Sequence, residues 1–309
     1  MSARRLDLVV VGDCCPDLVV RGANVRPAFG DVEQIVDDAP LVIGGSAAIT
    51  ACGAARLGAR TALCSLVGDD VYGEFMRAKL TERGVDTTGI VTTQSASTGI
   101  SIILAAEGER AILTALGTIA KLEAEHVDLT LLAEARHLHV TPFFLLAGLR
   151  PGLGDLLQTA RSMGLTTSLD TNWDPTEQWD GGLSEVLAAA DYLFVNGAEA
   201  SWISGESDAA QAAAALSALG PTAVVKLGRD GALAHGPTGV SRCPAGRPTA
   251  VVDTVGAGDS FNAGFLVGRL AGKSIPESLA IGCRCGTLST RTAGGTDGQA
   301  TMAEVEAAE

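Results

Sequence analysis

The chain has 309 residues, of which 47% are hydrophobic and 19% charged, and its formal net charge is −14. This composition is typical of a folded protein with a large core, and the acidic balance argues against a nucleic-acid binder, which needs Lys and Arg to neutralise phosphates. Asp7 and Asp13 interrupt the first apolar run, so we expect neither a membrane-spanning segment nor a secretory signal.

The seven cysteines lie mostly in apolar runs. An odd number in such settings indicates reduced thiols rather than a disulfide framework, and we therefore expect a cytoplasmic protein. The cysteines and the four histidines form no paired motif at zinc spacing. Small buried thiols are therefore favoured over a metal site.

Strand-like and helix-like runs alternate along most of the chain. Short apolar runs predict strands at 6–11, 17–20, 61–67, 99–105, 111–113, 138–140, 166–169, 192–195 and 223–226. Periodic Ala- or Leu-rich runs predict helices after 44–45, at 73–84, 151–163, 183–190 and 208–219, after 256, and at 302–309. This alternation indicates βαβ units around a mostly parallel sheet.

Two stretches, 17–42 and 95–117, break the alternation because they are β-like and poor in helix pattern. In the second, residues 107–110 read as a Gly-containing hairpin turn. We expect the two stretches to pair as a small sheet that projects from the α/β body. No internal repeat or low-complexity linker divides the chain, so residues 1–309 are expected to form a single domain that carries this sheet as a lid.

The strongest chemical signal is the run DTVGAGDSFNAGF at 253–265. Gly256 and Gly258 around Ala257 permit a tight turn, and helical residues follow, so the amides of 256–259 would lie at a helix N-terminus that attracts anions. Asp259 lies at this turn. From the residues alone, it either caps the helix, interacts favourably with the helix dipole, or takes part in chemistry there.

This run resembles the second signature of the PfkB/ribokinase family of carbohydrate kinases. Four further stretches resemble family motifs in family order, so the resemblance extends from about residue 8 to 295. They are Gly44-Gly45-Ser46-Ala47-Ala48-Ile49 through Ala59, Gly68-Asp69-Asp70 with Gly73, Asn196-x-x-Glu199, and Lys226-Leu227-Gly228-x-x-Gly231.

The resemblance implies a ribokinase-like three-layer α/β sandwich with a β lid, and transfer of the γ-phosphoryl group of ATP to a hydroxyl of a sugar or sugar-like molecule. It implies that Asp259 is the catalytic base, with the amides of Gly256, Ala257 and Gly258 as an anion hole. In several members of the family two lids pack together, so it also implies a homodimer through the lid.

The resemblance implies further ligand sites. Nucleotide contacts would come from Asn196, Lys226, Gly228 and Gly231, and Glu199 would hold Mg²⁺ through water. A monovalent cation such as K⁺ would lie near Asp253, Val255, Ser289 and Gly294.

On the acceptor side, the resemblance implies contacts from Asp17, Gly44 and Gly45. Ile49 and Cys15 stand where ribokinase-like sugar sites commonly have Asn, which disfavours ribose itself because hydroxyls without partners are costly to bury. Ile49 is either an acceptor contact or a core residue of its helix. Arg110 is either a partner for an anionic substrate group or an exposed turn arginine.

Other interpretations remain open. Asp170, Asn172 and Asp174 either face ligands or form Asx turns. A nucleoside kinase of the same fold would need an aromatic-lined lid pocket, for which the lid offers only Phe29. A non-catalytic sugar- or nucleotide-binding relative is the third possibility. A Walker P-loop at 272–274 is excluded because Val267 stands where that motif needs glycine.

Overall fold

The computed structural model describes residues 4–23, 25–106, 109–246 and 250–308. Within these residues a nine-stranded sheet has the order β13-β12-β11-β10-β9-β8-β1-β4-β5. Its strands are β1 (Leu8–Gly12), β4 (Thr61–Gly68), β5 (Ile90–Thr93), β8 (His137–Thr141), β9 (Thr166–Asp170), β10 (Tyr192–Asn196), β11 (Thr222–Lys226), β12 (Ala232–Gly236) and β13 (Gly239–Cys243). Neighbours pair in parallel except β12, which is antiparallel to both β11 and β13.

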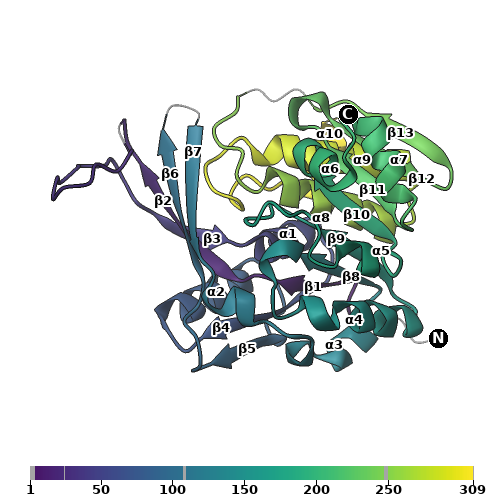
Figure 1. Cartoon of the computed structure of the whole chain (residues 1–309), viewed down its shortest axis with the longest axis horizontal. Coiled ribbons are helices and arrows are strands. Elements are labelled where there is room, and N and C mark those ends of the chain that lie inside the picture. Colours follow the sequence, from purple (N-terminus) through teal and green to yellow (C-terminus); the bar gives the residue numbers. More distant parts are fainter. Residues whose placement is uncertain (1–3, 24, 107–108, 247–249, 309) are drawn as a thin grey trace.

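Helices cover both faces of this sheet (Figure 1). They are α1 (Ser46–Arg56), α2 (Val71–Glu82), α3 (Leu129–Ala133), α4 (Arg150–Ser162), α5 (Leu183–Leu187), α6 (Gly197–Ser204), α7 (Ala209–Ser217), α8 (Ala257–Leu270), α9 (Ile275–Ser289) and α10 (Met302–Ala307), with short 3₁₀ turns η1 (Gly117–Lys121), η2 (Ala124–His126), η3 (Phe143–Leu145) and η4 (Gly228–Asp230).

Alternate residues of each strand enter two separate cores, as the period of a strand requires. In β1, Val9 and Val11 pack in the core that includes Leu157 of α4, whereas Leu8 and Val10 pack in the core that includes Phe265 of α8. Both faces of the sheet are therefore buried, which explains why its strands are continuously apolar. The result is the three-layer α/β arrangement expected from the sequence.

A second, four-stranded sheet has the order β3-β2-β6-β7. Its strands are β2 (Cys15–Arg21), β3 (Leu41–Gly44), β6 (Ile100–Ala106) and β7 (Glu109–Ala115). Figure 1 shows β2, β6 and β7 projecting beyond the helical layers. The two stretches that break the alternation do pair, as predicted, through the parallel contact of β2 with β6. We call this second sheet the small sheet.

The hairpin turn differs from the prediction. Glu109 and Arg110 belong to β7, where Arg110 pairs with Ala105, so Arg110 is a strand residue and not a turn residue. The remaining predicted turn residues, Glu107 and Gly108, lie outside the described residues. The position matters because a strand holds the Arg110 side chain on a defined face of the small sheet.

Two other expectations from the sequence were reduced cysteines and the lack of a membrane-spanning segment. All seven cysteines are free thiols, and every one except Cys243 is buried. Among the described residues, no helix is long and apolar enough to cross a bilayer.

Candidate functional site

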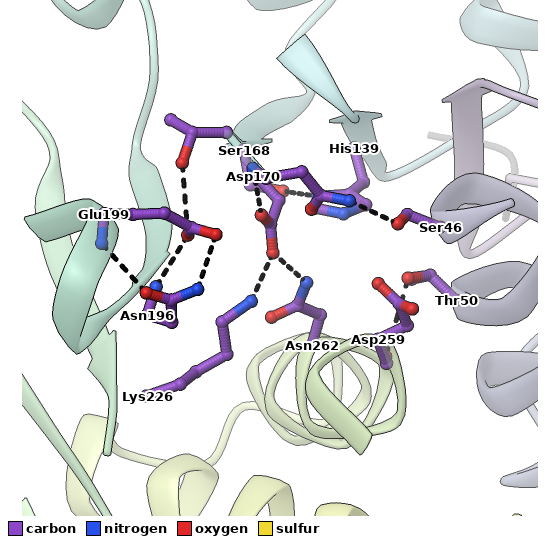
Figure 2. Close-up of polar contacts among 12 residues, drawn as sticks. Ser46, Thr50, His139, Ser168, Asp170, Asn196, Glu199, Lys226, Asp259 and Asn262 are labelled. Carbon is purple, nitrogen blue, oxygen red and sulfur yellow. Dashed lines mark hydrogen bonds and ion pairs between the residues drawn. The ribbon is translucent and has the colours of Figure 1, made fainter. Parts of the chain in front are cut away.

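Polar side chains gather at the carboxyl ends of the parallel strands. Asp13 directly follows β1, Asp170 ends β9, Asn196 ends β10 and Lys226 ends β11. In open α/β sheets this edge is where ligands bind. The first turn of α8, which carries Asp259, lies beside Asp170 and Lys226 (Figure 2).

The N-terminus of α8 depends on Gly256. This residue is the N-cap with φ +70°, and a Cβ there would lie 2.8 Å from the Gly295 Cα. Asp259 is the third residue of the helix, so the capping interpretation of this carboxyl is wrong. First-turn amides lack carbonyl partners within a helix. Ala257 is an exception because its amide donates to the Thr254 carbonyl at 3.3 Å.

The Asp259 carboxyl is only 9% exposed. Its pKa is raised to about 8, mainly by burial; the negative charges of Asp170 and Asp13 also raise it, and the charge of Lys226 opposes them. A buried carboxyl whose pKa lies near the working pH is suited to accept a proton from a bound hydroxyl.

A cavity of about 580 Å³ opens beside Asp259, between the main sheet and the small sheet. Sequence-predicted residues that line it are Asp17, Gly45, Ile49, Arg110, Val255, Gly256 and Asp259. Gly44 lies beneath Asp17, since a Cβ on Gly44 would come within 2.0 Å of the Asp17 Oδ1. Glycine at position 44 therefore gives the carboxylate the room it needs.

Asp17 and Arg110 reach the cavity from the small sheet. Asp17, on β2, is 5% exposed. Its pKa is raised to about 7, mainly by burial; the charge of Asp13 also raises it, and the charge of Arg110 opposes this. Arg110, on β7, donates from Nη1 to the Thr254 Oγ1 at 3.4 Å, and so spans from the small sheet to the loop before α8.

Ile49 fits both interpretations made from the sequence. It lines the cavity, yet it is 3% exposed and belongs to the core on the α8 side of the sheet. Its side chain packs against the backbone of Gly295, where a Cβ would lie 2.6 Å from the Ile49 Cδ1. The same side chain therefore shapes both the helix packing and the cavity wall.

A buried ion pair lies on the other side of Asp259 (Figure 2). The Lys226 Nζ and the Asn262 Nδ2 both donate to the Asp170 Oδ2 at 2.5 Å. Burial lowers the pKa of Lys226, but the charges of Asp170 and Glu199 outweigh it and raise the pKa above its usual value. A Cβ on Gly258 would lie 3.4 Å from the Lys226 Nζ, so the ammonium lies against the first turn of α8.

Asn196 and Glu199 form a reciprocal capping box at the start of α6. The Asn196 Oδ1 accepts from the Glu199 amide at 2.9 Å, and the Glu199 Oε2 accepts from the Asn196 amide at 2.8 Å. The Thr171 Oγ1 also donates to the Glu199 Oε2, at 3.4 Å. Burial, with the nearby charge of Asp170, raises the pKa of Glu199 to about 7. The pair thus has a clear structural role.

The two glycines of the predicted nucleotide loop differ. Gly231 has φ +92°, and a Cβ there would lie 2.0 Å from the Cys243 carbonyl oxygen, so the turn from β11 into β12 requires it. Gly228 has φ +57° with nothing within 4 Å of its Cβ position. Only Gly228 therefore faces open space, where a ligand could approach the backbone.

Of the predicted monovalent-cation residues, Asp253 and Val255 lie in the loop before α8, Gly294 lies in the loop after α9, and Ser289 is the last residue of α9. The Asp253 Oδ1 accepts from the Val255 amide and its Oδ2 from the Gly294 amide, both at 2.9 Å. The Ser289 hydroxyl donates to the Gly286 carbonyl at 2.9 Å. Within the described ranges, no group of three or more His, Cys, Asp or Glu side chains is placed to hold a metal ion.

The sequence analysis did not identify Asp13 as a site residue. It left open whether Asp170, Asn172 and Asp174 face ligands or form Asx turns. Asp13 is 5% exposed, lines the cavity and accepts from the Ala47 amide through Oδ1 at 2.8 Å. Asn172 lines the cavity and donates to the Ser46 Oγ at 2.6 Å. Asp174 instead forms an Asx turn to the Thr176 amide at 2.9 Å. The signal for Asp13 was its place directly after a buried strand.

The chain matches known proteins over most of its length. Residues 5–302 match the family model for pfkB family carbohydrate kinases. A fructokinase of Klebsiella pneumoniae is 34% identical over 81% of this chain and 86% of its own, and an ATP-dependent ribose-1-phosphate kinase of Halopiger xanaduensis is 32% identical over 80% and 79%.

A solved structure has the same fold as this chain. The ribokinase of Arabidopsis thaliana, complexed with ribose and ATP, superimposes with a TM-score of 0.86 and 22% identity over 98% of both chains, which shows the ribokinase-like fold. With a family match over nearly the whole length, the chain belongs to the pfkB family of carbohydrate kinases, phosphotransferases that use ATP to phosphorylate an alcohol group of a sugar.

Proposed function

We propose that this chain transfers the γ-phosphoryl group of ATP to a sugar hydroxyl bound in the cavity beside Asp259, with Asp259 as the base. The observation that carries the proposal is the placement of a buried carboxyl with a raised pKa at a helix N-terminus and in the wall of that cavity. The acceptor hydroxyl would donate its proton to the carboxylate as its oxygen attacks phosphorus.

The positive end of α8 would stabilise charge on the transferred group. First-turn amides and the helix dipole attract anions, and the amides of Gly256 and Gly258 are better candidates than that of Ala257, which already bonds to Thr254. Lys226 adds a partly buried ammonium against the same turn. Phosphoryl transfer needs mainly such positioning and electrostatic stabilisation. Asn196 and Gly228 would border the nucleotide.

The residues present fit Mg²⁺ held through water. Hydrogen bonds from Asn196 and Thr171 fix the Glu199 carboxylate, whose oxygens keep lone pairs for water ligands. Bound Mg²⁺ would neutralise negative charge on the ATP phosphates. For K⁺, both Asp253 oxygens are occupied by amides, so Asp253 would shape the loop while backbone carbonyls coordinated the ion.

We also propose a cytoplasmic homodimer that joins through the small sheet, the lid of the cavity. The free thiols fit a reducing compartment. On β7, Ile112 and Leu113 are more than half exposed, which suits a partner surface. Sedimentation at micromolar concentration checks the assembly, and an active monomer would remove this part of the proposal.

The test of the activity is ADP release from ATP in the presence of a panel of sugars and polyols. Turnover with at least one member, dependent on Mg²⁺ and lost in Asp259→Asn, is the expected result. A wild-type rate in Asp259→Asn would show that another group accepts the proton.

A further inference from the structure

Two cysteines meet where β13 packs against α9. Cys243 is the last residue of β13, and Cys283 lies within α9. Cys243 pairs with Ala232 in the main sheet, and both pack in the core that includes Phe265, to which Cys283 also belongs. The Cys283 Sγ donates to the Cys243 carbonyl oxygen at 3.9 Å. A strand end and a helix therefore bring the two residues into contact.

The two thiols also interact with each other. Burial raises the pKa of the Cys283 thiol, and the charge of Cys243 and a hydrogen bond between the two side chains also raise it. Their sulfur atoms are thus within hydrogen-bonding reach. Cys243 is half-buried, whereas the other six thiols of the chain are buried. A reagent in solvent therefore meets Cys243 first, and Cys283 is the thiol beside it.

The contact between the two cysteines adjoins the predicted nucleotide loop. The Cys243 carbonyl oxygen, which accepts from Cys283, would lie 2.0 Å from a Cβ on Gly231, so it packs directly against the turn from β11 into β12. The same turn carries Gly228, which faces open space. Any movement of this end of β13 toward α9 therefore displaces the backbone against which the turn rests.

We propose that Cys243 and Cys283 are a redox-modification site, which a low-molecular-weight disulfide oxidises to an internal disulfide, and that this bond weakens nucleotide binding. The second part rests on the proposed function. An accessible thiol with a buried thiol beside it is the arrangement that reversible oxidation needs, because the first reacts and the second resolves. In a reducing compartment such disulfides are transient.

The oxidation balances with glutathione disulfide as the oxidant. The Cys243 thiolate attacks one sulfur of glutathione disulfide, which forms a mixed disulfide and releases one glutathione. The Cys283 thiol then gives up its proton, and its sulfur attacks the Cys243 sulfur, so that the internal bond forms and a second glutathione leaves. The pair loses two protons and two electrons, which reduce glutathione disulfide to two glutathione molecules.

Closing the bond changes the local structure. It brings the two sulfur atoms to about 2.0 Å, closer than thiols in hydrogen-bonded contact. The end of β13 and α9 must therefore approach one another, and the Cys243 carbonyl oxygen moves relative to Gly231. The expected consequence is a misplaced turn at Gly228.

The first test treats the full chain with glutathione disulfide and follows intact mass and peptide maps. The expected product has lost two hydrogen atoms, contains one crosslink between the Cys243 and Cys283 peptides, and reverts with dithiothreitol. Because Cys243 is half-buried, Cys243→Ala should remove the crosslink without opening the core. Cys285→Ala, also buried in α9, is the matched control and should keep it. An unchanged mass, a crosslink between other cysteines, or a lasting glutathione adduct on the wild-type chain overturns the proposal.

The second test compares the reduced and oxidised chain in ADP binding by calorimetry and in kcat/KM for ATP. Oxidation should weaken ADP binding and lower kcat/KM by about tenfold, because a displacement of about 1 Å near a site can cost up to about 10²-fold. Cys243→Ala should abolish this sensitivity. Equal values in the two forms refute the effect on the nucleotide site. If the reduced chain neither binds ADP nor turns over ATP, the proposed function fails, while the mass test still decides the disulfide.

Discussion

The buried pair between Lys226 and Asp170 gives a stability prediction that can be worked out from the structure. Lys226→Met removes the ammonium from a carboxylate that is fully buried. Breaking a buried pair on one side costs about 3–5 kcal/mol because the other charge is left uncompensated. The Lys226 side chain is 15% exposed, so water can reach the gap, and we expect a loss near the lower limit, about 3 kcal/mol.

Unfolding entropy of about 2.1 cal/mol/K per residue gives about 0.65 kcal/mol/K for 309 residues, so this loss should lower Tm by about 5 °C. The surface pair of Lys79 with Glu82, at 2.8 Å, is the matched control. Since both side chains are well exposed, Lys79→Met should cost less than about 0.5 kcal/mol and shift Tm by less than about 1 °C.

A double-mutant cycle supplies the decisive comparison. In urea unfolding of the ligand-free protein, Lys226→Met combined with Asp170→Asn should lose clearly less than the sum of the two single changes, because neither charge is then left alone. If the losses add to within about 0.5 kcal/mol, the two groups are not coupled and the assigned ion pair is refuted.

Three further predictions concern the cavity and Asp259. Asp259→Asn should lower kcat by about 10²–10⁴ without lowering Tm, measured by ADP release and thermal unfolding; a kcat within threefold of wild type contradicts the assigned base. In the folded state the pKa values of Asp17 and Asp259 are about 7 and about 8, whereas the pKa of an unfolded Asp is about 4. The folded state therefore binds more protons than the unfolded state at neutral pH. Stability is lost as these protons leave, so Tm should fall from about pH 6.5 to about pH 8.5. The lowered pKa values of His137 and His139 oppose this only below about pH 6.5, and a flat or rising Tm above that pH contradicts the raised carboxyl pKa values. Ile49→Asn buries an amide in both the core and the cavity wall, so it should cost about 1–3 kcal/mol of stability and also change the acceptor ranking; an unchanged ranking removes Ile49 from the acceptor site.

The fold was predictable where the sequence signal is local. The apolar runs and intervening helices of the parallel sheet have clear periods, and both halves of the small sheet were recognised because they lack a helical period. The hairpin of β12 and β13 was missed because its strands are short and contain glycine and exposed residues. β3 was missed because it is a four-residue strand next to two glycines.

The site was predictable where a compact motif carries it, as at Asp259. It was not predictable where chemistry depends on contacts between distant segments. Lys226 and Asp170 are 56 residues apart, and Asp13 and Ala47 are 34 apart. Only the strand order of the sheet, which no local pattern contains, brings such pairs together.

The small sheet is joined to the body of the protein at four connections: between β1 and β2, between β3 and α1, between β5 and β6, and between β7 and η1. Asp13 lies in the first connection and Gly45 in the second, whereas Asp17 and Arg110 are carried on the small sheet itself. Asp259 stays with α8 in the body. The distance between the carboxyl groups of Asp17 and Asp259 therefore depends on the angle between the two sheets. Because residues of both the small sheet and the body line the cavity, any change in the angle between the small sheet and the body would alter cavity volume, electrostatic potential and solvent access together.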